Sequence, residues 1–200
     1  MRGRYLWFAV LALLAAVAFH GSAPAGAAAA IATVDGTIQS VASALVVIMT
    51  KMGQTKVTTT TDTRVIGRSP ARMSEIKVDD FVGVDSKRTA NGSLSAVEVH
   101  IFPPALKAPS RERQFLMDSG DTMTNAVVTQ QVTRVSGRTL TLSYPGGTTT
   151  VIVPPSAAIH RLTVVTLAAL KPGMHATARG PANPDGNVIA TTIVVDQASR

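Results

Sequence analysis

The chain contains an internal repeat with a constant offset of 94 residues. Two hairpin signals, Asn91-Gly92 and Asp185-Gly186, are separated by this distance, and such dipeptides are the strongest short-range indication of a β-hairpin. Apolar positions recur in the same register. Examples are Ile38 with Val132, Val46 with Leu140, Val65 with Ile159 and Val99 with Ile193. We therefore expect a duplicated domain.

Alternation of apolar and polar residues predicts five strands in each copy. In the first copy they lie near 33–41, 44–50, 55–61, 80–88 and 93–102. In the second copy they lie near 127–135, 138–144, 148–153, 174–180 and 188–195. The many β-branched residues of these stretches favour a pleated, half-buried surface. Between the third and fourth strands of each copy we expect an irregular segment with one helical turn.

Five short strands with a helical turn after the third favour a partly open barrel of the oligonucleotide/oligosaccharide-binding (OB) type. We predict an all-β protein with two tandem, small, five-stranded OB-like barrels after an N-terminal signal helix. The expected divisions are a signal peptide at 1–30, a first barrel repeat at 31–104, a connector at 105–125 and a second barrel repeat at 126–200. About 70 residues bury only a modest core, so the two barrels should pack together.

The first residues predict export. Arg2 and Arg4 precede the apolar run Tyr5–Phe19, and small residues suitable for cleavage follow, as in a secretory signal peptide. The fifteen residues of this run would span about 22 Å as a helix, less than the roughly 30 Å of a hydrocarbon core. We expect cleavage between Ala25 and Ala30, a periplasmic or secreted location, and no integral membrane domain in the mature chain. Cysteine is absent, which excludes disulfides and thiol catalysis.

The stretch Ser95–Pro104 contains the most suggestive polar pair. Alternation places Ala96, Glu98, His100 and Phe102 on one face of a strand, and Val97, Val99 and Ile101 on the core face. The favoured interpretation is a solvated or interfacial ion-paired face, and the alternatives are part of a ligand site or a site of proton transfer. Two ligands fall short of the three or four that a metal site needs. The sequence therefore predicts no metal site and no cofactor, and it leaves Glu98 and His100 as ligand-binding candidates.

Other potential ligands are isolated in the sequence. Met49 and Met52 are predicted to lie on opposite faces of a strand and its turn, and His160 and His175 stand singly, which does not favour a copper site. The chain lacks the G-x-S-x-G, H-E-x-x-H, P-loop and dinucleotide-binding motifs. We expect no catalytic residue and a non-enzymatic protein.

The positive charge does not by itself indicate a nucleic-acid partner. The formal net charge is +7, and residues 126–200 carry six Lys/Arg against two Asp/Glu. Proteins that bind single strands stack bases on aromatic side chains. Beyond the signal segment the aromatic residues are Phe81, Phe102, Phe115 and Tyr144. We therefore expect no nucleic-acid partner.

Several motifs carry a family resemblance. The stretches AVEVHIFPP, DTMTNAVV, GRTLTLSYPGG and PDGNVIA resemble a family of exported bacterial proteins of unknown function with tandem small β-barrel domains. Its members are sometimes labelled metal-transporter permeases, but this chain has at most one potential membrane span. The family connector often carries a histidine and a tryptophan, which the stretch SRERQFLMD lacks.

The resemblance and the residues together imply a non-enzymatic binding or interaction module of the cell envelope. Its partner would be an envelope protein or a small ligand. The alternative is a periplasmic metal-binding accessory protein, in which Glu98 and His100 are joined by a ligand from the connector.

Overall fold

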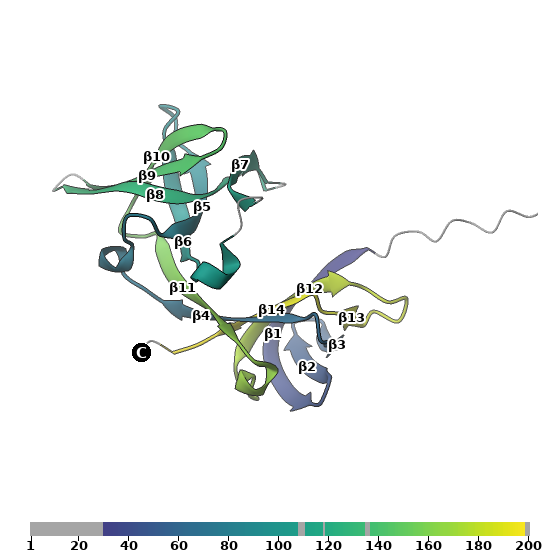
Figure 1. Cartoon of the computed structure of the whole chain (residues 1–200). Helices are drawn as coiled ribbons and strands as arrows, with labels where there is room; N and C mark the ends of the chain where they lie inside the picture. Colours follow the sequence, from purple (N-terminus) through teal and green to yellow (C-terminus); the bar gives the residue numbers. More distant parts are fainter. Residues whose placement is uncertain (1–29, 108–110, 118, 135–136, 199–200) are drawn as a thin grey trace, which may run out of the picture.

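The computed structural model describes residues 30–107, 111–117, 119–134 and 137–198 (Figure 1). These residues form strands, turns and short 3-10 segments, and no α-helix occurs among them, which confirms the all-β prediction. The predicted signal peptide at 1–30 lies, apart from its last residue, outside the described ranges. In the described part of the chain, no helix has the length and apolar character needed to cross a membrane.

Each repeat forms the predicted strands and additional ones. The first repeat contains β1 (Ile31–Ala42), β2 (Leu45–Thr50), β3 (Gly53–Thr58), β4 (Arg64–Pro70), η1 (Met73–Glu75), β5 (Phe81–Arg88) and β6 (Leu94–Ile101). The connector contains η2 (Pro104–Leu106) and β7 (Arg113–Leu116). The second repeat contains β8 (Thr122–Arg134), β9 (Gly137–Tyr144), β10 (Gly147–Val153), β11 (Ala158–Val165), η4 (Leu167–Ala169), β12 (His175–Pro181), β13 (Val188–Ile189) and β14 (Thr192–Asp196).

Three strands were not predicted, and the single strand predicted near 188–195 is divided into β13 and β14. β4 and β11 occupy the segments expected to be irregular, although the expected helical turn follows each of them as η1 and η4. β7 lies in the connector, which is therefore not irregular throughout. The apolar pattern of β4 is interrupted by Gly67 and Pro70. Glycine and proline are uncommon inside strands, so the sequence did not predict a strand here.

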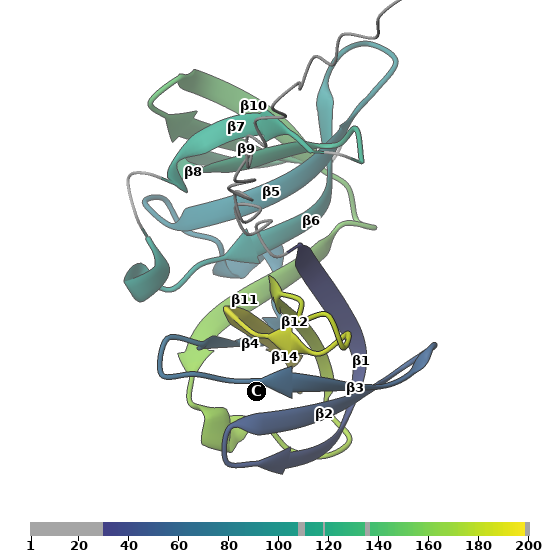
Figure 2. The ribbon, with the colours of Figure 1, turned by 90° about the vertical axis from the view of Figure 1, so that its right-hand side faces the viewer.

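The protein has two hydrophobic cores, and each combines strands from both repeats (Figures 1 and 2). Barrel I consists of β5 and β6 from the first repeat with β8, β9 and β10 from the second. It closes through parallel pairing of β10 with β6. The second core lies among β1, β2 and β3 with β12, β13 and β14, and we refer to this group of strands as barrel II. Each core therefore contains strands from both of the ranges predicted as repeats, 31–104 and 126–200.

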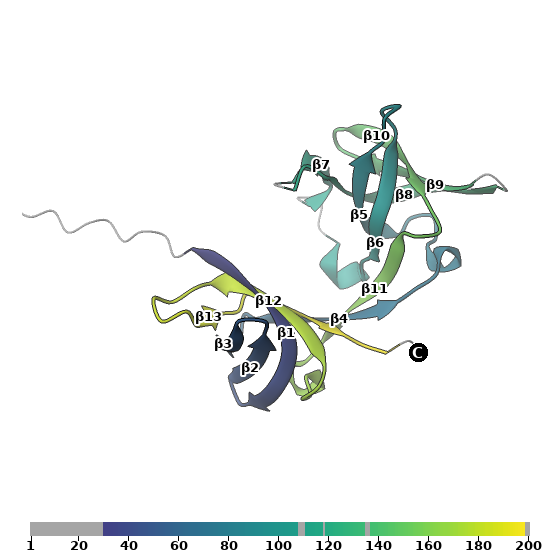
Figure 3. The ribbon, with the colours of Figure 1, turned by 180° about the vertical axis from the view of Figure 1, so that it is seen from behind.

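β4 and β11 connect the two barrels and cross between them (Figures 1 and 3). Along the first repeat, β4 takes the chain from barrel II to barrel I. Along the second repeat, β11 takes the chain from barrel I to barrel II. The two strands pair with each other antiparallel. β11 also pairs in parallel with β6, and β4 pairs in parallel with β14. Each barrel is thereby extended by one crossing strand.

The constant offset fails in the first strand of each repeat. Ile38 N donates to Met174 O, and Val128 N donates to Asp80 O, so these two bonds are equivalent in the two barrels. Met174 and Asp80 are 94 residues apart, but Val128 and Ile38 are only 90 apart. The predicted equivalence of Ile38 with Val132 is therefore wrong by four residues.

Candidate metal centre

The outer face of β6 carries the two residues selected from the sequence. Val99 and Ile101 are 0% and 1% exposed in the core of barrel I, as predicted, so Glu98 and His100 point away from that core. The prediction was wrong for the two preceding residues: Ala96 is buried in this core and Val97 is 41% exposed, because a register shift in the β5–β6 ladder leaves Val97 without a partner on β5. β11 lies beside β6 in parallel, and its His160 is directly opposite His100. Because successive side chains alternate across a strand, His160 shares the outer face.

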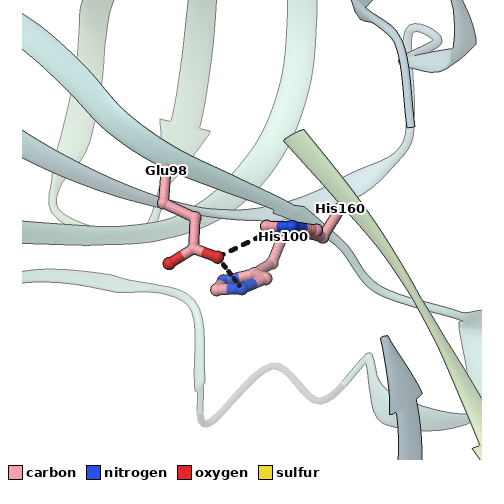
Figure 4. Close-up of side chains that lie close together, drawn as sticks. All are labelled: Glu98, His100 and His160. Carbon is pink, nitrogen blue, oxygen red and sulfur yellow. Dashed lines mark ion pairs between the residues drawn. The ribbon is translucent and has the colours of Figure 1, made fainter. Parts of the chain in front are cut away.

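Three side chains converge at this position (Figure 4). Glu98 Oε1 lies 3.0 Å from His100 Nε2 and 2.7 Å from His160 Nδ1. Both nitrogens thus approach the same carboxylate oxygen. The imidazole rings are stacked with centroids 5.9 Å apart. All three side chains are half-buried.

The spacing and the chemistry of these atoms suit a metal ion. One ligand atom from each residue lies within 4.8 Å of the other two. In a tetrahedral zinc site with bonds of about 2.0–2.1 Å, ligand atoms are separated by roughly 3.3 Å. Two imidazoles and one carboxylate form a common ligand set for catalytic zinc and for non-haem iron.

Two buried atoms at this position lack hydrogen-bond partners. Among the described residues, His160 Nδ1 and Asp85 Oδ1 are the only buried side-chain nitrogen or oxygen atoms without one. The His160–Glu98 separation is short, but the Glu98 oxygen does not lie in a hydrogen-bonding direction from the ring nitrogen. Asp85 lies on β5 directly opposite Glu98. Buried polar atoms are nearly always paired, and a cation held by Glu98, His100 and His160 would satisfy His160 Nδ1.

The two carboxylates have opposite pKa shifts. Contact with His100 is the main cause that lowers the pKa of Glu98 to about 2, assisted by the charges of His100, His160 and Arg68 and opposed by burial. Burial is the main cause that raises the pKa of Asp85, and the negative charges of Asp121 and Glu98 raise it further. Glu98 is therefore an anion across the neutral range, as a metal ligand must be.

Arg68 connects this cluster to a second group of charges in barrel II. Its Nη1 lies 3.8 Å from Glu98 Oε1, and its Nε donates to Asp196 Oδ1 at 2.7 Å. Asp196 Oδ2 is 3.3 Å from His175 Nδ1, and His175 Nε2 is 3.4 Å from Asp35 Oδ1. His175 contacts its two carboxylates through different nitrogens, so this second group is a chain of ion pairs and not a convergent ligand set.

The structure changes the interpretation of the isolated histidines. His160 and His175 each contact carboxylates, and His160 supplies the third ligand that the sequence did not reveal. That ligand comes from β11 of the second repeat, and not from the connector as the accessory-protein hypothesis required. Met49 and Met52 lie at the β2–β3 hairpin of barrel II, and Met52 is fully exposed. They do not contribute to the cluster.

Comparison with known proteins gives one partial match. Residues 35–100 match a family described as "Domain of unknown function (DUF5666)". No curated protein and no solved structure matches the chain. The matched segment corresponds to the first repeat, and it includes Glu98 and His100 but not His160. The matched unit therefore carries two of the three converging side chains.

Proposed function

We propose that this protein binds a divalent transition-metal ion through Glu98, His100 and His160. The observation that carries the proposal is the convergence of both histidine nitrogens on Glu98 Oε1, with His160 Nδ1 buried and lacking a hydrogen-bond partner. Zinc and copper(II) are the ions that we favour, because imidazole nitrogen suits both.

A purely ion-paired cluster is the competing interpretation, and it was the one favoured from the sequence. In such a cluster Glu98 would balance its histidines and Arg68 through hydrogen bonds. However, directly opposed like charges are destabilising, and Asp85 lies opposite Glu98 with one buried oxygen unpaired. A divalent ion beside these two residues would offset the repulsion between their carboxylates, which an ion-paired histidine does only while it is protonated.

The wider role that we propose is a non-enzymatic metal-binding module that works outside the cytoplasm. The support for export is the basic and apolar pattern of residues 2–30. We also propose that both barrels are OB-like, each with three strands from one repeat and its remaining strands from the other. The three ligands lie where the two barrels cross. Metal binding therefore depends on how the two barrels are arranged relative to each other.

Thermal unfolding during titration with zinc or copper(II) tests the proposal. The wild type is compared with His100→Gln, His160→Gln and, as a matched control, His175→Gln. A ligand at a hundredfold excess over its dissociation constant stabilises the native state by roughly 2.7 kcal/mol. We expect a metal-dependent rise in melting temperature for the wild type and the control that is absent from the other two variants. An equal response in all four proteins, or none in any, contradicts the proposal.

A further inference from the structure

A cleft of about 700 Å³ opens on the outer face of barrel I, beside the candidate metal centre. Small-molecule sites commonly have volumes of about 300–1,000 Å³. Its lining includes Phe102, Phe115, Met117, Met123, His100 and Arg179. Arg179 belongs to β12, so the cleft has a wall from each barrel.

The cleft and the metal centre are parts of one surface. Phe115 lies opposite Met123, Met123 opposite Asp85, and Asp85 opposite Glu98 on the successive strands β7, β8, β5 and β6. Neighbouring strands are about 4.8 Å apart, so Met123 lies roughly 10 Å from Glu98. His100 belongs to both sites, since it contacts Glu98 and lines the cleft.

The floor of the cleft is apolar and has room for a flat ring. Phe115 is 37% exposed although it belongs to a strand. A Cβ atom at Gly83 would lie 2.8 Å from the Phe102 ring and 2.9 Å from Asn125 Oδ1. Glycine at this position therefore allows Phe102 to lie close against β5. Thioethers such as those of Met117 and Met123 make favourable contacts with aromatic rings.

The charge of the lining favours an anion. Arg179 is exposed and forms no ion pair with the residues that the structure describes. A guanidinium presents a planar fork of donors that matches a carboxylate or sulfonate. A second guanidinium, that of Arg113, lies over the Phe115 ring with its Cζ 4.8 Å from the ring centroid. An apolar floor beside guanidinium groups complements a ligand that has an apolar ring and a single negative group.

We infer that this cleft binds a small aromatic acid. The ring packs on Phe102, Phe115 and the two methionines, and the acidic group faces Arg179. The inference goes beyond metal binding and does not depend on it, because neither the apolar floor nor Arg179 is a metal ligand.

The test uses the full mature chain in the presence of a chelator, so that failure of the metal proposal leaves its outcome unaffected. The probe is 1-anilinonaphthalene-8-sulfonate, and its fluorescence is followed during titration. Displacement is then measured with 2-naphthoate, with the neutral 2-naphthylmethanol and with the cationic 2-naphthylmethylamine. We expect the acid to displace the probe at concentrations at least about tenfold lower than the alcohol, and the amine to displace it least.

Two variants locate the binding. Arg179→Gln should weaken binding of 2-naphthoate about tenfold or more while leaving that of the alcohol nearly unchanged, and Phe115→Ala should weaken both. Arg88→Gln is the matched control, since Arg88 lies in the β5–β6 hairpin and binds Gly92 O. Equal displacement by acid and amine, or unchanged binding in Arg179→Gln, overturns the inference. Unfolding curves of each variant show whether a loss arises from misfolding, and Arg179→Lys then serves as a second variant with intermediate affinity expected.

Discussion

Arg68 lies directly opposite Leu162 in the β4–β11 ladder, and these two residues occupy equivalent positions in the two repeats, 94 residues apart. The ladder is therefore symmetric about this pair, and the two repeats are related by a local two-fold axis through it. The side chains break the symmetry, because Arg68 contacts carboxylates of both barrels whereas Leu162 is a buried aliphatic residue. Where β4 and β11 cross, the backbone is therefore the same in the two repeats, whereas the side chains differ in chemistry.

The three proposed metal ligands show the same asymmetry. β14 pairs with β4 in the manner in which β6 pairs with β11, so Val194 lies opposite Ile66 where His100 lies opposite His160. The positions equivalent to the three ligands are Thr192, Val194 and Ile66. All three are half-buried. The equivalent position on β14 and β4 thus has a matching backbone but no side chains that bind metal.

This equivalence predicts that a second centre can be built. The triple variant Thr192→Glu, Val194→His and Ile66→His should raise the stoichiometry of zinc binding from one ion to two per chain, as measured by isothermal titration calorimetry. The single variant Ile66→His, as a control, should still bind one. A triple variant that folds, as judged by its unfolding transition, and still binds one ion would contradict the proposed symmetry of the two positions.

Stability should separate the two faces of β6 in the metal-free protein. Val99 is fully buried, and Val99→Ala should cost roughly 2 kcal/mol through lost burial and a small cavity. His100 is half-buried, so His100→Ala should cost less, about 0.5–1 kcal/mol, mainly through loss of its contact with Glu98. Urea unfolding in the presence of a chelator measures both values. The reverse order would mean that the outer-face cluster, and not the core, dominates the stability of this strand.

The sequence was sufficient to predict the local structure but not how the repeats combine. Alternation around Val99 correctly placed Glu98 and His100 on the outer face, since the pattern of one strand depends on local residues. The pairing of β6 with β11, by contrast, joins residues far apart in the sequence, and the alternation within one strand carries no information about it. β4 runs extended into the other barrel and so determines how the two repeats combine. Gly67 interrupts its apolar pattern, and the sequence therefore did not predict this strand. His160 was therefore separated from His100 by 60 residues with no signal that joined them.

Acid should destabilise the protein partly through Glu98. Its pKa in the folded state is about 2, below the ordinary value of 4.5, so the ionised form is favoured by folding. The resulting stabilisation is fully present above about pH 4.5–5 and is lost as the pH falls toward 2. The groups that face this carboxylate are His100, His160, Arg68 and Asp85.

The measurement is the urea midpoint of the metal-free protein between pH 2 and pH 6. Glu98→Gln should have a lower midpoint than the wild type at pH 6, and the difference should shrink as the pH approaches 2. Asp196→Asn is a control for loss of another Arg68 partner. A difference between wild type and Glu98→Gln that stays constant over this range would exclude a depressed pKa.

Asp85 should affect metal affinity although it is not one of the three converging ligands. It lies directly opposite Glu98 and has one buried oxygen without a hydrogen-bond partner in the described structure. Loss of a group that supports the ligands of a metal commonly lowers affinity by about 10–100-fold. Asp85→Asn should therefore weaken zinc binding at least about tenfold. In the metal-free protein the same variant should be as stable as the wild type or more stable, since the repulsion of Glu98 is removed. Calorimetry measures the affinity and urea unfolding measures the stability. A variant with lower metal-free stability and unchanged affinity would assign Asp85 a purely structural role.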